Sequence, residues 1–176
     1  MKRLAIVFSI VLFHLNTGFC QVNLPVPQVA DSLSFMLGTW TGDGWIRMGP
    51  KKETFQLTEI ISSKVDGAVL SIDGLGVATD SVTNETKKVH DAFGVVYYDA
   101  ETKEFRITAF SSAAAKKDVE FKVANRVLTW GFKTDNGGMV RFTEDFSKDG
   151  KWTTLGEYSA DGSRWFAFMQ YNLERK

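Results

Sequence analysis

The sequence predicts an all-β protein, a single up-and-down antiparallel β-barrel of about ten strands with a short N-terminal helical turn closing one end. Three observations lead to this fold class. Turn-forming residue pairs recur along the chain, and the residues between them alternate with the period of two that strands require. Gly38-Thr39-Trp40 opens the first expected strand. In such a barrel the glycine lets the chain bend into the strand, and Trp40 is expected to plug the closed end against the last strand.

The turn chemistry divides the chain into its elements. A helical turn is expected over residues 32–37, with Asp31 or Ser32 as its cap. Asn-Gly and Asp-Gly pairs accept the positive φ angles of tight hairpins, so successive breaks of this kind imply up-and-down topology. The breaks are Gly49-Pro50, Asp66-Gly67, Asp99-Ala100-Glu101-Thr102, Asn136-Gly137-Gly138, Asp149-Gly150 and Asp161-Gly162. The expected strands cover about 39–48, 52–64, 68–79, 88–98, 103–111, 117–123, 126–133, 138–147, 151–159 and 164–174.

The first 20 residues are predicted to be a secretory signal peptide. Lys2 and Arg3 precede an apolar run over residues 4–15 that is too short to span a membrane. Cleavage after Cys20 would leave residues 21–30 as an N-terminal extension and 31–176 as the barrel domain, in a protein that is secreted or periplasmic. The minor alternative is a lipid anchor attached to Cys20.

Composition excludes several classes of protein. Cys20 is the only cysteine of the chain, so the body of the protein can form no disulfide, and stability must come from its core. Without Lys2 and Arg3, acidic residues exceed basic ones by two, and the basic residues are scattered. A nucleic-acid partner and a polybasic membrane patch are therefore not expected, and no membrane span is expected in the mature chain.

Both faces of the central and last strands carry apolar residues. In the expected fourth strand, Phe93 alternates with Ala92 and Gly94, and the last strand is similar. In a barrel with one solvent-exposed face, apolar and polar residues would alternate more regularly along each strand. The second apolar face must therefore meet a cavity, a ligand or another subunit. Ten strands enclose more than side chains usually fill, since eight already hold a small ligand. A barrel filled completely by its own aromatic residues remains the alternative.

Two segments resemble a known group of barrels. The run over residues 37–44, Leu-Gly-Thr-Trp-Thr-Gly-Asp-Gly, resembles the opening strand of nitrobindin-like and fatty-acid-binding-protein-like barrels of the calycin superfamily. The run over residues 158–165 is similar to the penultimate hairpin of secreted bacterial lipocalin-like domains of unknown function. The resemblance implies a lipocalin-like barrel, and Arg175 is available to stack across Trp40 as its closing basic residue.

The nitrobindin resemblance also implies a haem pocket, and here the sequence departs from the pattern. The iron-binding histidine of those proteins lies in the last strand, where this chain has Met169 and Tyr171. His90 is the only histidine after the predicted leader, and it is more simply interpreted as a hydrogen-bonded wall residue. Haem is therefore disfavoured, although a tyrosine can ligate ferric haem, and no cofactor or metal is expected.

Motifs for catalysis are weak, so the sequence favours a protein that is not an enzyme. No cluster of histidine and cysteine has metal-ligand spacing, and no nucleophile-elbow or phosphate-loop pattern occurs. Acidic residues within strands could pair as acid and base, or could be solvated residues and counter-ions to Arg106 and Arg141. These acidic residues are Glu59, Asp91, Glu144 and Glu157.

The expected function is non-covalent binding of a small hydrophobic or amphipathic molecule in the barrel. The alternatives are an enzyme of the same fold acting on a small lipid-like substrate and a structural barrel that self-associates, for example as a homodimer. Buried polar groups in apolar strands would orient the ligand, and aromatic residues would supply most of the affinity. The candidate ligand-binding residues are Arg141, Glu157, His90, Tyr171, Met169, Phe93 and Trp130.

Arg141 carries the most specific of these hypotheses. If it points inward, its planar guanidinium suits a carboxylate, and the ligand would be anionic. The alternative is that Val140 and Phe142 form the inward set, which places Arg141 on the wet face.

Overall fold

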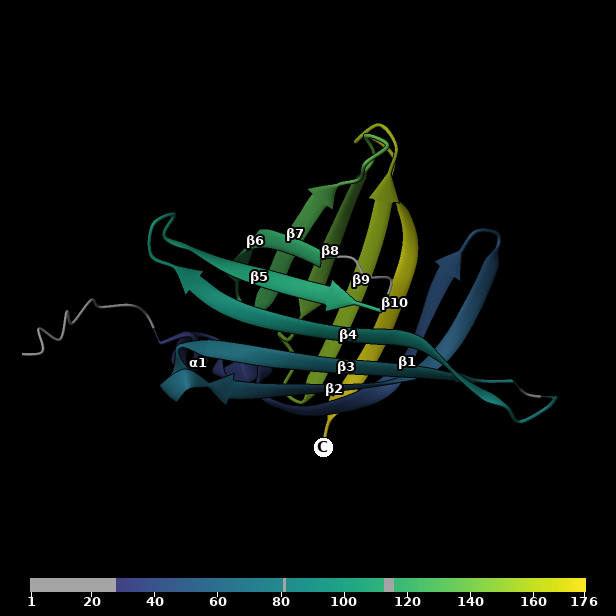
Figure 1. Ribbon diagram of the computed structural model, residues 1–176, viewed down its shortest axis with the longest axis horizontal. Helices are drawn as coiled ribbons and strands as arrows, with labels where there is room; N and C mark the ends of the chain where they lie inside the picture. Colours follow the sequence, from purple (N-terminus) through teal and green to yellow (C-terminus); the bar gives the residue numbers. More distant parts are fainter. Residues whose placement is uncertain (1–27, 81, 113–115) are drawn as a thin grey trace, which may run out of the picture.

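The computed structural model describes residues 28–80, 82–112 and 116–176, and they form a closed ten-stranded barrel (Figure 1). The predicted signal peptide lies outside these residues, as does most of the predicted extension. The expected strands are all present, with ends shifted by one or two residues. They are β1 Gly38–Met48, β2 Lys51–Lys64, β3 Val69–Thr79, β4 Thr86–Asp99, β5 Glu104–Ser111, β6 Lys116–Ala124, β7 Val127–Lys133, β8 Met139–Asp145, β9 Lys151–Ser159 and β10 Phe166–Arg175.

Each strand pairs antiparallel with its neighbours in sequence, and β1 pairs with β10 to close the barrel. This confirms the predicted up-and-down topology. The closing seam runs from the pair Trp40–Arg175 to the pair Ile46–Met169. Because the strands alternate in direction, β1, β3, β5, β7 and β9 all end at one end of the barrel, and the N-terminal segment and Arg175 lie at the other.

One tight turn escaped prediction. Asn125 and Arg126 join β6 to β7, and both have positive φ, 52° and 64°. A two-residue hairpin with positive φ at both positions is the type that matches strand twist. Arginine is an unusual residue in the left-handed region, so the pair carries no Asn-Gly or Asp-Gly signal. It is supported instead by the hydrogen bond from the Phe146 amide to the Arg126 carbonyl oxygen, 3.0 Å long.

The N-terminal segment covers one end of the barrel, as predicted, but begins earlier than expected (Figure 1). Helix α1 spans Val29–Ser32, and the 3-10 turn η1 spans Ser34–Met36. Gln28 is the N-cap of α1 and makes no side-chain capping bond. The expected cap at Asp31 or Ser32 is therefore wrong, because both residues lie inside the helix. Val29, Leu33 and Met36 are buried where this segment meets the barrel.

Trp40 plugs this end and contacts the last strand, as the Gly-x-Trp pattern predicted. Its side chain is fully buried, and its Nε1 donates a 2.8 Å hydrogen bond to the carbonyl oxygen of Met36. The Arg175 guanidinium lies 4.5 Å from the centre of the Trp40 ring and donates to the carbonyl oxygen of Phe35. Phe146 packs edge-on against the same ring at 5.4 Å. One tryptophan thus joins the N-terminal turn, the first strand and the C-terminus.

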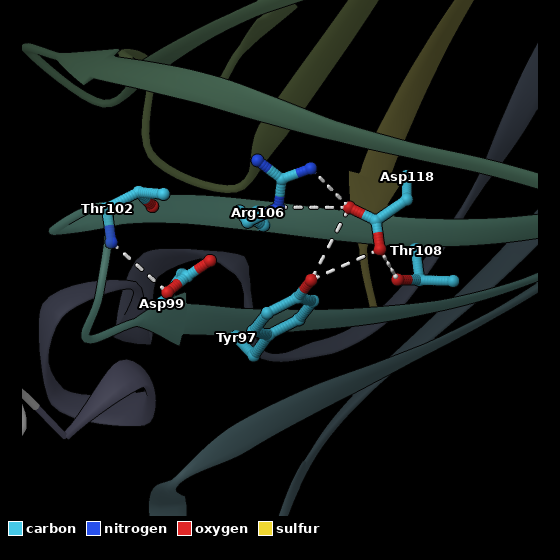
Figure 2. A network of polar contacts seen from close by, with 6 residues as sticks. All are labelled: Tyr97, Asp99, Thr102, Arg106, Thr108 and Asp118. Atoms are coloured by element: carbon cyan, nitrogen blue, oxygen red, sulfur yellow. Dashed lines mark hydrogen bonds and ion pairs between the residues drawn. The ribbon is translucent and has the colours of Figure 1, made fainter.

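A polar network on the outside of β4, β5 and β6 shows which residues of these strands face out (Figure 2). Arg106 donates to Asp118 from both Nε and a terminal nitrogen, at 3.0 and 2.6 Å. Thr108 and Tyr97 donate to the same carboxylate at 2.8 and 3.2 Å. These partners hold the pKa of Asp118 below its usual value, with Arg106 as the largest cause. The alternating residues of the same strands therefore face the interior.

Candidate functional site

The barrel encloses a cavity of about 330 Å³. This volume lies at the lower end of the range for small-molecule sites. The barrel is therefore not filled by its own side chains, which excludes the fully packed alternative. Most of the wall is apolar, and its main contributors are Ile72, Val96, Ile107, Val119, Phe121, Leu128, Trp130, Phe142, Trp152 and Met169.

Glycines on the inner face of β3 make room for larger inward side chains. At Gly74 a Cβ atom would lie 2.6 Å from Oε1 of Glu59, so the carboxyl of Glu59 occupies the space that a side chain would fill. At Gly76 a Cβ would lie 2.8 Å from the Cβ of His90. The β3–β4 register shifts just after Gly76, as expected for glycine at a strand irregularity. The absence of side chains at Gly74 and Gly76 thus leaves the space that Glu59 and His90 occupy.

Glu144 of β8 is the best-bonded polar group of the cavity. One of its oxygens accepts from Trp152 Nε1 at 2.9 Å and from the hydroxyl of Thr154, and the other accepts from Trp130 Nε1 at 3.3 Å. The side chain is buried, and this desolvation raises the pKa of its carboxyl despite the three donors; the neighbouring Glu59 contributes in the same direction. Glu144 therefore has little bonding capacity left for a ligand.

Tyr171 of β10 lies beside this group. Its ring packs edge-on against Trp152 at 5.6 Å, and its side chain is 7% exposed. Burial raises the pKa of its hydroxyl well above the ordinary value, with further contributions from Glu144 and Glu59. The hydroxyl is consequently a neutral hydrogen-bonding group in the cavity wall.

Glu59 of β2 has unused bonding capacity. It is 4% exposed and lines the cavity. Oε1 lies 3.7 Å from Nε2 of His90, beyond an ordinary hydrogen bond, and Oε2 has no partner among the described residues. A buried carboxyl oxygen without a donor is costly, by about 1–3 kcal/mol or more. Glu59 is thus a polar group of the cavity wall with an unmet hydrogen bond among the described residues.

The end of the cavity near the β5–β6 turn carries a basic side chain. Lys117, near the start of β6, lines the cavity, and its Nζ lies 4.9 Å above the centre of the Phe132 ring. Ser111, at the end of β5, borders the same region. The polar groups of the cavity are therefore divided between buried carboxyls in the interior and a partly exposed ammonium near one end.

The structure places five of the seven predicted ligand-binding residues at the cavity. His90, Trp130, Met169 and Tyr171 all line the cavity. Phe93 borders it, but its strand position is opposite to that of His90 and Ala92, and it is 42% exposed beside Phe110. Phe93 is thus mainly a residue of the outer surface.

Arg141 and Glu157 lie outside the barrel, so their expected inward orientation is wrong. Arg141 Nε donates to Glu157 at 2.7 Å, and its guanidinium stacks 4.1 Å from the centre of the Trp165 ring. Val140 and Phe142, its neighbours in β8, are buried instead. Since side chains alternate along a strand, the buried pair fixes Arg141 on the outer face. Arg141 therefore cannot bind an anionic ligand inside the barrel.

Glu59 and Glu144 line the cavity but were not among the predicted ligand-binding residues. A signal for Glu144 existed, since it shares its strand parity with Val140 and Phe142. The same signal marked Glu59, which shares its strand parity with the buried Phe55, Leu57 and Ile61. In the closed barrel Gly74 of β3 lies across from Glu59.

The interior does not fit the haem arrangement that the nitrobindin resemblance implied. The last strand presents Met169 and Tyr171 to the cavity in place of a histidine. His90 projects from β4 with Nε2 beside Glu59. Within the described residues, no three metal-ligating side chains gather closely enough to hold an ion, and no helix is long and apolar enough to cross a membrane.

Known structures share the barrel but little sequence. The crystal structure of Rv2717c from M. tuberculosis superposes with a TM-score of 0.61 at 11% identity, covering 85% of this chain and 98% of that chain. The S-type phycobiliprotein lyase CPES from Guillardia theta gives a TM-score of 0.57 at 12% identity, covering 84% and 92%. No family model and no curated protein matches the sequence. At such identities the likeness establishes the fold alone, a closed antiparallel β-barrel.

Proposed function

We propose that this protein binds a small, largely apolar molecule inside the barrel and performs no chemistry on it. The cavity carries the proposal, because a concave apolar space with few polar groups is the usual form of a ligand site. Filling it would remove apolar surface from water at about 25 cal/mol per Å². The ligand requires no cofactor or metal under this proposal.

Titration with N-phenyl-1-naphthylamine, an apolar dye that fluoresces when it leaves water, tests the proposal. The wild type should bind about one dye per chain. Ala92→Phe places a ring in the cavity and should weaken binding at least tenfold, whereas Leu75→Phe, an exposed position on neighbouring β3, should change it by less than about twofold. Equal binding by both variants, or no binding by the wild type, would contradict the proposal.

An enzyme acting on a small lipid-like substrate is the second candidate, and one observation favours it. Two carboxyls, Glu59 and Glu144, face one cavity, and the pKa of Glu144 is raised, as is common for catalytic acids. Against it, the Glu144 oxygens are engaged by Trp130, Trp152 and Thr154, which hold the group in place as part of the wall. Binding therefore explains the site better than acid–base catalysis.

We also propose that the mature protein acts outside the cytoplasm, because its sequence begins with a predicted secretory leader. Binding then serves to hold or carry a molecule there.

Self-association through the outer surface is a third proposal, supported by the exposed Phe93 and Phe110 side by side on β4 and β5. Native mass spectrometry of protein purified from its own host would reveal both a retained ligand and the number of chains.

A further inference from the structure

The polar groups of the cavity differ in how far their bonding is satisfied. Glu144 accepts three hydrogen bonds, and Tyr171 is a neutral hydroxyl. Glu59 has one oxygen at 3.7 Å from His90 and the other without a donor. A carboxyl oxygen without a donor is completed by a hydrogen-bond donor, so the group that would complete Glu59 is a donor.

From this mismatch we infer that the ligand carries a basic nitrogen, as an amphipathic amine does, and that this nitrogen binds the Glu59 carboxyl with the apolar part in the cavity. The inference rests on the proposed binding function and names the class of ligand. Hydrogen bonds between an ammonium and a carboxylate are about twice as strong as neutral ones. An amine also satisfies the oxygen that the protein itself leaves without a donor.

Gly74 gives the site its shape. The Glu59 carboxyl lies against this residue, with a would-be Cβ at 2.6 and 2.7 Å from its two oxygens. A side chain at position 74 would push the carboxyl away, so the glycine and the carboxyl form one arrangement. The aliphatic walls contributed by Ile72, Val96 and Ile107 supply the apolar surface for the rest of the ligand.

A preference for an anionic ligand would need Lys117, whose ammonium lies on the cavity wall. Lys117 already stacks on Phe132 and is only partly buried near one end, so it carries no comparable unmet bond. Arg141, the residue first expected to bind a carboxylate, is outside and paired with Glu157. A fatty acid bound at Lys117 is therefore the competing outcome of the test.

The experiment compares decylamine, 1-decanol and decanoate, three probes with alkyl chains of the same length and different head groups. Each competes with N-phenyl-1-naphthylamine at a concentration below that at which it forms micelles. For the wild type we expect decylamine to bind at least tenfold more tightly than 1-decanol, and decanoate to bind most weakly. Glu59→Gln keeps the shape of the side chain and should reduce the amine preference to within about threefold. Glu157→Gln removes an outer carboxyl and should leave the preference unchanged.

A second measurement on the wild type keeps the test valid if Glu59→Gln fails to fold. In the NMR spectrum of the decylamine complex, the methylene next to nitrogen should show nuclear Overhauser contacts to the Gly74 backbone. Three outcomes would each overturn the inference while leaving the binding function intact. They are equal binding of amine and alcohol, an unchanged amine preference in Glu59→Gln, and a decanoate preference that Lys117→Met abolishes. If no probe and no dye binds, the proposed function itself fails.

Discussion

Trp40 concentrates several contacts in one buried side chain. It hydrogen-bonds to the Met36 carbonyl oxygen, stacks under Arg175 and packs against Phe146 and Trp152. Removing its ring would leave a cavity at the closed end and a buried carbonyl without its donor. We expect Trp40→Ala to reduce the free energy of unfolding by about 3–5 kcal/mol, measured by urea denaturation.

Trp45 is the matched control, since it lies in the same strand on the opposite face. Lys52 stacks on its ring at 4.2 Å, and the residue is only partly buried. Trp45→Ala should therefore cost about 1 kcal/mol or less. Similar losses at the two positions would show that Trp40 is not the plug of this end.

Single residues also show the limit of prediction from sequence. Trp40 and Arg175 were predicted correctly because a local pattern specified the role of each. Arg141 and Glu144 lie on opposite faces of β8, and the sequence left both faces open because Met139 shares a face with Arg141 while Val140 and Phe142 share one with Glu144. The structure decides it through Phe142, whose ring stacks on Trp130 at 4.1 Å inside the barrel.

At the scale of elements, the closing seam between β1 and β10 depends on close approach of two backbones. At Gly42 a Cβ atom would lie 2.1 Å from the carbonyl oxygen of Asn172 and 3.0 Å from the Cα of Leu173. These are backbone atoms of the neighbouring strand and cannot rotate away. We expect Gly42→Ala to lower the free energy of unfolding by about 1–3 kcal/mol and to lower the melting temperature.

Gly94 of β4 provides the matched control for this strand glycine. A Cβ there would meet Ile107 at 3.5 Å, which is ordinary van der Waals contact. Gly94→Ala should therefore be neutral or stabilising by up to about 1 kcal/mol, because alanine restricts the unfolded chain. If both variants lose the same stability, the seam has no special steric requirement.

The strands themselves were largely predictable, whereas their inner faces were not. Gly and Asp at the turns fix where strands end through local backbone geometry, so strand order and number followed from the sequence. The tight turn at Asn125 and Arg126 was the exception, because arginine has no preference for the positive φ angle that Arg126 adopts there. The inner face of β4 depends on barrel closure, a long-range property that no local pattern of residues 86–99 records.

The whole molecule separates its carboxyls into two electrostatic classes. Several outer carboxyls are held by cations or backbone amides that lower their pKa: Arg106 does so for Asp118, and amides lower that of Asp161 to about 2. The exposed Glu104 is an exception, because its hydrogen bond with Glu120 raises its pKa. The buried Glu144 is the reverse, since desolvation raises its pKa. The outer groups contribute stability above about pH 4, and this contribution is lost as the pH falls through their lowered pKa values.

Glu144 should impose the opposite pH dependence on the stability of the barrel. Its contribution is fully present below about pH 4.3, the pKa of an unfolded glutamate, and is lost as the pH rises through the raised pKa of the folded state. Between pH 4.5 and 8 the outer carboxyls with lowered pKa stay ionised, and Tyr171, whose pKa is raised, stays neutral. Glu104, whose pKa is raised by Glu120, titrates alike in the wild type and in Glu144→Gln. Wild-type stability should therefore fall relative to Glu144→Gln across this window, by up to about 1.4 kcal/mol per pH unit.

Urea denaturation at several pH values measures this difference. Glu174→Gln removes an outer carboxyl whose pKa is lowered by Lys151, so its stability should run parallel to that of the wild type between pH 4.5 and 8. The Glu144→Gln curve should instead diverge from the wild-type curve as the pH rises, because only the wild type must then either ionise a buried carboxyl or keep a proton that the unfolded chain releases. Parallel curves for all three proteins would mean that Glu144 titrates as an ordinary solvated glutamate and that water reaches this part of the cavity.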